Sequence, residues 1–274
     1  MSESKLTFEE YLKKCDLSRN TISSYLWTVD YYNSNYQSIN RDSLSAYRCY
    51  LAENYKPKTV NARIQAINKY LEYLGRERLK LKGIKLQQKS FLENVISNAD
   101  YSFFKNQLKK DGRLQWYFVV WYLAATGARV SELVQIKIEH VEAGRIDLYG
   151  KGGKIRRIYI PECLRRETLA WLSKEGRSSG YLFLNRFGNR ISTRGIAQQL
   201  AHFAEKYGID KRLVHPHSFR HLFAKNFLEH HNDIALLADL MGHESIETTR
   251  IYLRHTAYEQ QEIVNNTVTC NLQR

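Results

Sequence analysis

The sequence has few prolines and no patterned cysteines. With 3 prolines in 274 residues, and with 43% hydrophobic and 12% aromatic residues, the chain can bury real cores, which excludes a disordered protein. Its cysteines are Cys15, Cys49, Cys163 and Cys270, and none belongs to a CxxC pair. Their scatter excludes a zinc knuckle and a disulfide framework and favours a reduced compartment.

Long apolar runs are missing as well. The first residues, MSESKLTFEEYLKK, contain no apolar signal core, and no run approaches the roughly 20 residues of a membrane span. The most apolar stretch, residues 116–125, is short and predicts a buried helix. No GxxxxGK[ST] loop for ATP is present. We therefore expect a cytoplasmic protein without membrane contact.

Basic residues outnumber acidic residues in this chain. The chain has 42 Lys and Arg against 28 Asp and Glu, a formal net charge of +14. Such an excess favours a polyanionic partner, nucleic acid first and an anionic membrane second. A charged surface that only keeps the protein in solution is the alternative.

The N-terminal region predicts a small helical bundle. Ser18 and Asp42 are good N-cap candidates for a second and a third helix, and Pro57 suits the first turn of a fourth. Apolar residues of the fourth helix recur every three or four positions, at Val60, Ile64, Ile67, Leu71 and Leu74. We expect residues 1–76 to form a small helical domain.

Residues 77–92 break the helical pattern. The stretch RERLKLKGIKLQQK, residues 76–89, is basic and contains a glycine. It predicts an interdomain linker, which either follows a phosphate backbone or is an ordinary solvated loop.

Residues 93–274 predict a larger domain that is mainly helical. Residues 145–149 and 155–160 alternate apolar and polar side chains around GKGG, which predicts a β-hairpin, and residues 181–184 are a candidate strand. The fold class is therefore α+β, mainly α with a small β-hairpin. Helices are expected at residues 98–110, 114–126, 129–136, 162–174, 193–207, 218–230, 233–241 and 246–253.

Two segments carry candidate anion-binding chemistry. In TGARVSEL, residues 126–133, Arg129 opens a helix, where guanidinium and free N–H groups lie together. A solvent-exposed arginine is the alternative, because the helix dipole disfavours a cation there. In HPHSFRH, residues 215–221, His217 and Arg220 share one helical face and can bind one phosphate. A metal cluster with His215 and His221 is disfavoured, because no cysteine or acid stands at ligand spacing.

A third segment contains a candidate nucleophile. In MGHESIETTRIY, residues 241–252, Gly242 stops a helix, His243 follows on the turn, and Tyr252 comes nine residues later. Any one of the 19 tyrosines is more often a core or surface residue than a nucleophile. The order of the whole set is what makes it specific.

That set resembles the tyrosine recombinase, or phage integrase, family over nearly the full length. The matching segments are TGARVSEL, GKGGKIRRIYIP, HSFRH and LMGHESIETTRIY. The size and the small N-terminal part look like compact Xer-type members, without an extra arm-binding domain. LFAKNFLEHH after His221 is bulkier than usual and Met241 replaces a common leucine, but neither departure touches the chemistry.

The resemblance implies a role for each matching residue. Tyr252 would be the nucleophile that forms a 3′-phosphotyrosine. Arg129 and Arg220 would hold the non-bridging oxygens of the scissile phosphate, and His217 and His243 would complete the phosphate clamp and handle protons. Such stabilisation by arginines needs neither metal nor ATP, so no cofactor is expected.

Two further roles follow from the resemblance. Lys151 would be the general acid that protonates the leaving 5′-oxygen, with Lys154 on the same hairpin as its rival. Glu132 would support the arginine and the histidine without doing chemistry itself.

The resemblance also implies how DNA is held. The two domains would form a C-shaped clamp on double-stranded DNA with paired half-sites, in a homotetramer or heterotetramer associated with the nucleoid, alongside accessory directionality proteins. The tail after Tyr252 would dock on a neighbouring subunit or fold back on its own domain. Candidate DNA contacts, which could equally be ordinary solvated positions, are Arg19, Thr21, Lys56, Lys58, Thr59 and Arg63.

Two other functions remain open. A type IB topoisomerase-like enzyme would use the same chemistry to relax supercoils without site preference. A non-catalytic DNA-binding factor is disfavoured, because all the chemical positions are filled.

Overall fold

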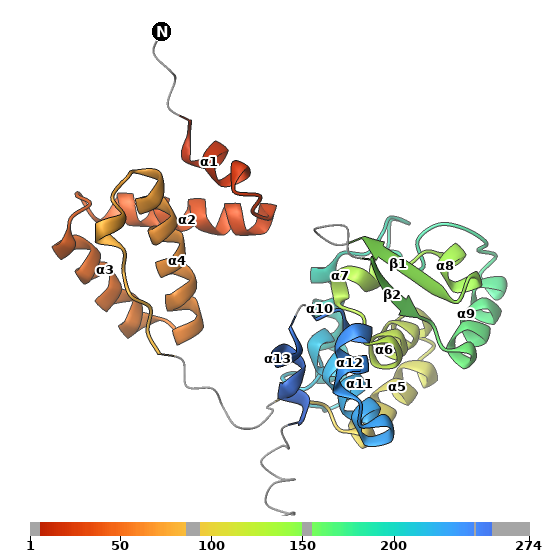
Figure 1. The fold of residues 1–274 in the computed structure, drawn as a ribbon. Helices are drawn as coiled ribbons and strands as arrows, with labels where there is room; N and C mark the ends of the chain where they lie inside the picture. The colour runs from red at the N-terminus through yellow and green to blue at the C-terminus, as the bar shows by residue number, and fades with distance from the viewer. Residues whose placement is uncertain (1–5, 86–93, 150–154, 244, 254–274) are drawn as a thin grey trace, which may run out of the picture. The chain divides into compact units, whose positions relative to one another are not determined.

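The computed structural model describes residues 6–85, 94–149, 155–243 and 245–253. The chain divides into two compact units, Met1–Gln88 and Lys89–Arg274, and each is described here by itself (Figure 1). Among the described residues, no helix combines the length and the apolar character needed to cross a membrane.

Four α-helices build the described part of the N-terminal unit, as the sequence predicts. Ser18 caps the second helix by accepting from the Thr21 N–H at 3.2 Å, and Pro57 occupies the first turn of the fourth. The prediction for the third helix is wrong in one respect: Asn40 is its N-cap, and Asp42 lies within its first turn. The helices are α1 (Phe8–Lys14), α2 (Arg19–Asn35), α3 (Arg41–Asn54) and α4 (Pro57–Tyr73).

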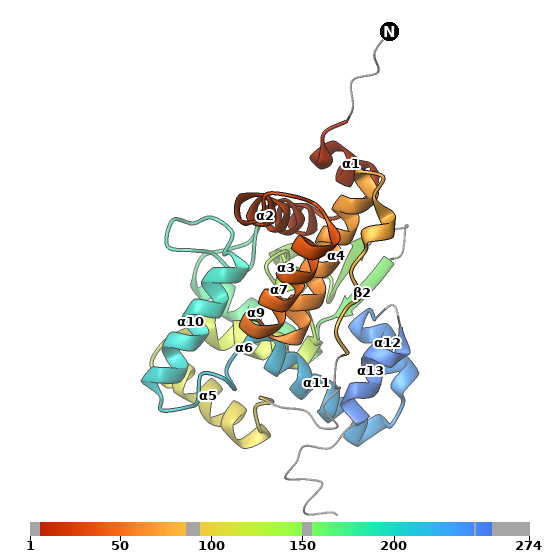
Figure 2. The same cartoon turned by 90° about the vertical axis from the view of Figure 1, so that its left-hand side faces the viewer.

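The core of this unit is rich in aromatic rings. α2 and α3 both pack against α4, and α3 and α4 run alongside each other (Figure 2). Tyr32 and Tyr47 are fully buried and meet edge to face, with ring centroids 5.2 Å apart. The apolar stripe of α4, which includes Val60, Ile64 and Leu71, closes the same core.

Residues 77–85 pack on the bundle, which differs from the linker predicted there. A short 3-10 helix, η1 (Glu77–Leu79), is followed by extended chain whose apolar side chains lie against the core. Asn68 and Asn61 bind the backbone of Leu81 and Ile84 respectively, each through both its amide groups. These pairings satisfy backbone groups that a free linker would leave to water. The rest of the predicted linker lies outside the described residues.

The second unit is mainly helical with one two-stranded sheet. Strands β1 (Arg145–Tyr149) and β2 (Ile155–Tyr159) pair antiparallel, with Tyr149 opposite Ile155, so the predicted hairpin is confirmed. Residues 181–184 form no strand, only isolated bridges at Tyr181 and Leu184. The helices are α5 (Asn98–Lys110), α6 (Leu114–Thr126), α7 (Val130–Leu133), α8 (Ile138–Glu142), α9 (Glu162–Lys174), α10 (Thr193–Lys206), α11 (Pro216–His231), α12 (Ile234–Met241), α13 (Ile246–Thr249) and η3 (Arg250–Leu253).

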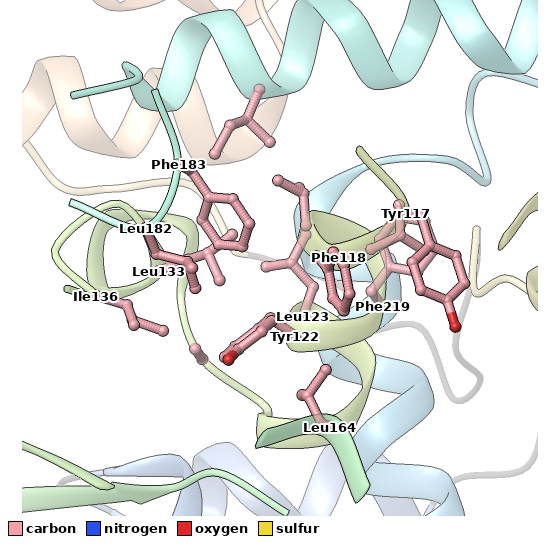
Figure 3. Packing of buried hydrophobic residues seen from close by; sticks show 14 of the residues in the cluster. Tyr117, Phe118, Tyr122, Leu123, Leu133, Ile136, Leu164, Leu182, Phe183 and Phe219 are labelled. Atoms are coloured by element: carbon pink, nitrogen blue, oxygen red, sulfur yellow. The ribbon is translucent and has the colours of Figure 1, made fainter. Parts of the chain in front are cut away.

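Helix α6 lies at the centre of this unit. Nearly all its faces are apolar, so neighbouring elements can bury it on several sides. Figure 3 shows Tyr122 and Leu123 among the side chains of Leu133 and Phe183. Gly127 then ends α6 in the left-handed conformation, with φ of +59°. A Cβ there would lie 2.5 Å from the Phe223 ring, so only glycine fits. This tight turn places the next residues at the start of α7, which is shorter than the predicted helix over residues 129–136.

Candidate active site

Arg129 is the N-cap residue of α7 and forms part of an ionic network. Its Nη1 donates to Glu132 Oε1 at 2.8 Å, while its backbone N–H donates to Glu132 Oε2 at 2.7 Å. The Nη2 atom of Arg129 donates to the carbonyl of Gly242 at 2.8 Å. Glu132 therefore fixes the guanidinium of Arg129 against the turn that follows α12, and 38% of the Arg129 side chain stays accessible.

Arg220 projects from α11 into the same turn. Its Nη1 donates to the carbonyl of Gly127, and its Nη2 donates to the carbonyl of Met241 at 2.7 Å. Burial, with the nearby charges of Arg129 and Arg156, lowers the pKa of Arg220 to about 10. Arg220 therefore remains charged at neutral pH although only 4% of it is exposed.

His243 lies on the turn between α12 and α13 and is neutral at pH 7. Burial, followed by the charge of Arg220, lowers the pKa of His243 to about 4. Arg220 Nη2 lies 3.0 Å from His243 Nε2, and because a guanidinium only donates, Nε2 must accept. The proton of the neutral ring is then on Nδ1, which donates to Thr249 Oγ1 at 2.7 Å.

Tyr252 belongs to η3 and lies between two imidazole rings. It stacks on His243, with centroids 6.2 Å apart and an interplanar angle of 7°, and it meets His221 at 5.2 Å. Only 7% of Tyr252 is exposed. Burial raises the pKa of Tyr252, whereas the charge of Arg220 and a hydrogen bond from it act in the opposite direction. Burial is the larger influence, so the pKa of Tyr252 lies above its ordinary value, and the nearby arginines offset only part of this increase.

The remaining predicted site residues are His217 on α11 and the two lysines of the hairpin. His217 is exposed on the first turn of α11, whose N-cap is its neighbour His215. Lys151 and its rival Lys154 lie outside the described residues. The structure therefore brings Arg129, Glu132, Arg220, His243 and Tyr252 together. His217 is exposed, and its charge contributes to the lowered pKa of His221, the ring that contacts Tyr252. Among the described residues, no group of three or more His, Cys, Asp and Glu side chains forms a metal-binding arrangement.

Arg156 is a member of the cluster that the sequence analysis missed. Its Nη1 pairs with Glu132, and its Nε and Nη2 donate to the carbonyl of Leu240 at 3.3 and 3.0 Å. The signal was present, because alternation along β2 puts Arg156 on the same face as the buried Ile158. A cation on an inward face needs a buried partner.

The candidate DNA contacts of the N-terminal unit divide into two groups. Arg19, Lys56, Lys58 and Thr59 are exposed at the starts of α2 and α4, whereas Thr21 is half-buried and bonded to the Ser18 hydroxyl.

Arg63 differs from these surface positions. Its guanidinium lies 4.5 Å from the Trp27 ring and 4.0 Å from the Tyr55 ring, and its Nη1 is buried without a hydrogen-bond partner among the described residues. Arg63 is thus half-buried and in contact with two rings, unlike the exposed candidate positions.

Comparison with known proteins identifies the family. Residues 96–259 match the phage integrase family. Tyrosine recombinase XerA of Pyrococcus furiosus is 32% identical over 266 residues, covering 94% of this chain and 91% of the relative. The chain therefore belongs to the phage integrase family, and the relative that it matches is a tyrosine recombinase.

Solved structures share the fold. A crystal structure of XerA recombinase is 25% identical with a TM-score of 0.54, and the match covers 96% of each chain. A structure of the XerH site-specific recombinase bound to its difH substrate, a pre-cleavage complex, is 20% identical with a TM-score of 0.68, and the match covers 95% of this chain and 85% of that one. The second likeness shows that the same fold occurs in a protein bound to its DNA substrate.

Proposed function

We propose that this protein is a site-specific DNA recombinase that cuts and rejoins strands through a covalent phosphotyrosine at Tyr252. One observation carries the proposal: Arg129, Arg220, His243 and Tyr252, which come from three separate segments of the sequence, meet in one cluster. Two guanidinium groups beside a phenol suit in-line attack on a phosphodiester.

In the cleavage step the Tyr252 oxygen would form a bond to phosphorus while the bond from phosphorus to the 5′-oxygen breaks. The phenol gives up its proton, for which we propose His217 as the acceptor, and the leaving 5′-oxygen gains a proton, for which we propose Lys151 as the donor. Free tyrosine has a pKa near 10 and attacks poorly at neutral pH. Arg129 and Arg220 would stabilise the phenolate and the charge that builds on the phosphate oxygens.

Rejoining reverses these bonds. A 5′-hydroxyl attacks phosphorus and releases the Tyr252 oxygen, so the energy of the original phosphodiester is retained in the covalent intermediate. The reaction then needs no ATP, and the arginine cations supply the electrostatic stabilisation that metal ions give in other phosphoryl-transfer sites. We propose integration, excision, inversion or resolution as the outcomes that this chemistry permits.

The proposed partner is double-stranded DNA with paired half-sites. The exposed starts of α2 and α4, with Arg19, Lys56 and Lys58, would contact phosphates, and the two units would clamp the duplex. Four subunits, of one kind or of two, would assemble on two sites, with the tail after Tyr252 docking on a neighbour and accessory proteins setting direction. Such a protein would work in the cytoplasm with the nucleoid. Deleting the residues after Ala257 should abolish synapsis while sparing DNA binding, and unchanged recombination would contradict this role of the tail.

A suicide substrate tests the proposal. A duplex selected from random DNA by the Tyr252→Phe protein is rebuilt with a nick beside the cleavage position, so that the released fragment diffuses away and the adduct is trapped. The unmodified protein should form a covalent adduct and Tyr252→Phe should form none, while Tyr159→Phe, at an exposed tyrosine of β2, should behave as the unmodified protein. An adduct that persists in Tyr252→Phe would contradict the assignment.

A further inference from the structure

Arg156 uses its whole guanidinium inside the protein. Its side chain and that of Glu132 are each only 12% exposed. One side of the fork pairs with Glu132, and the other donates to the Leu240 carbonyl. Arg156 therefore joins strand β2, helix α7 and the end of α12 through a single planar group.

The stem of Arg156 also packs on the turn that follows α12. A Cβ added at Gly242 would lie 2.2 Å from Arg156 Cδ and 2.7 Å from its Nε, so the two residues are in close contact. Gly242 is also the residue whose carbonyl accepts from Arg129. The backbone that binds Arg129 and carries His243 thus rests directly on Arg156.

We propose that Arg156 is a positioning residue of the active site, which holds Glu132 and the turn from Leu240 to His243 in the arrangement that orients Arg129. This inference rests on the proposed function, because it assigns Arg129 to the scissile phosphate. Arg156 itself does not touch the substrate, since its donors are already used within the protein.

The charge of Glu132 depends on this arrangement. Burial raises the pKa of Glu132, but the charge of Arg156, followed by hydrogen bonds from Arg129, keeps it below its ordinary value. The charged groups that face Glu132 are Arg129 on its own element, Arg156 on β2 and Arg220 on α11. Removing Arg156 leaves a buried carboxylate with less compensation, so Glu132 should take up a proton more easily and release Arg129.

The test compares variants of neighbouring residues on one strand. Arg156→Met should slow single-turnover cleavage of the suicide substrate by about 10- to 100-fold, as happens when outer residues that orient a metal ligand are lost. Its DNA affinity should stay close to that of the unmodified protein. Arg156→Lys keeps the charge but cannot span both acceptors, so an intermediate rate is expected.

Arg157→Met is the matched control. Arg157 is the next residue of β2 and pairs on the exposed side of the hairpin with Asp147, at 2.6 and 2.8 Å. Its loss removes the same charge from the same strand, and cleavage should be unchanged. Thermal unfolding of all variants separates loss of activity from loss of fold.

The pH profile separates positioning from a merely structural role. Cleavage by Arg156→Met should fall as the pH decreases, because Glu132 takes up a proton more easily without the charge of Arg156, while cleavage by the unmodified protein should be less sensitive to the same decrease. The double variant Arg156→Met with Glu132→Gln should lose this acid limb. If Arg156→Met cleaves at the rate of the unmodified protein, the inference about Arg156 is overturned and the proposed function is not. The same holds if the loss of cleavage is independent of pH and follows the loss in melting temperature. Absence of an adduct with the unmodified protein overturns the proposed function, and the inference with it.

Discussion

The guanidinium groups of Arg129 and Arg220 donate hydrogen bonds to two consecutive carbonyl groups, those of Gly242 and Met241, at 2.8 and 2.7 Å. The two arginines are 91 residues apart in sequence, yet one turn aligns them. His243 follows immediately and binds Arg220. The turn after α12 is therefore the structural element that assembles the cationic part of the site.

Arginine should not be replaceable by lysine at either position. Arg129→Lys and Arg220→Lys keep the charge but lose the planar fork that bonds the turn and a phosphate together. We expect each to reduce the single-turnover cleavage rate by about 100- to 1000-fold, the usual effect of losing one donor to a transition state. Arg212→Lys is the control, since Arg212 pairs only locally with Asp210 at an exposed site. Cleavage by Arg129→Lys at the unmodified rate would contradict the role of Arg129.

Stability should fall in mild acid. Burial is the main cause that lowers the pKa of both His243 and His221 to about 4, below the ordinary histidine value of 6.5. Between these values the unfolded chain binds more protons than the folded chain, so the free energy of unfolding decreases as the pH falls from 6.5 towards 4. Urea unfolding at several pH values measures this trend.

His221→Phe provides the comparison for the acid effect. His221 Nδ1 is buried without a hydrogen-bond partner among the described residues, so an apolar ring of similar shape should be tolerated there. The variant should show a shallower decrease in stability with falling pH. An unchanged slope would mean that His221 does not titrate as the structure implies.

Gly242 should tolerate no side chain. Its φ is +61°, and an added Cβ would meet Arg156 Cδ at 2.2 Å. Gly208→Ala is a matched control, because Gly208 has φ of +70° and nothing within 4 Å of an added Cβ. Both variants carry the backbone strain, but Gly242→Ala should lose about 1–3 kcal/mol more from overpacking, together with cleavage activity. Equal free energies of unfolding for the two would contradict the close contact.

Two basic residues of α4 should behave differently towards DNA. Lys58 is exposed, so Lys58→Met should weaken DNA binding and reduce the slope of log affinity against log salt by about 0.9. Arg63 stacks between Trp27 and Tyr55, so Arg63→Met should mainly destabilise the N-terminal unit, by about 0.5–2 kcal/mol. Titration of DNA at several salt concentrations, with thermal unfolding, distinguishes these effects.

The sequence predicts those elements whose ends carry local signals. Helices α5, α6 and α9 begin and end as expected, because Ser97 caps one, Gly127 ends another and Pro161 precedes the third. Where two local signals compete, as with Asn40 and Asp42, the choice depends on backbone conformation that spacing does not reveal.

Contacts between residues that are far apart in the chain could not be predicted from the sequence. The segment after α4 looked like a linker because its partners, Asn61 and Asn68, act from the preceding helix. Alternation along β2 indicates that Arg156 faces inward, but its partner Glu132, 24 residues earlier on another element, cannot be identified from the sequence. The motif residues were found from their order along the chain, but the burial of Tyr252 and the neutral state of His243 arise only when the segments meet.

The most direct measurement is to identify the residue that carries the DNA in the trapped adduct. Digesting the adduct with protease and nuclease and sequencing the linked peptide by mass spectrometry reports both the amino acid and the DNA end. The account predicts one modified peptide, with a nucleotide 3′-phosphate on the Tyr252 oxygen. A nucleotide on any other residue, or linkage through a 5′-phosphate, would contradict it.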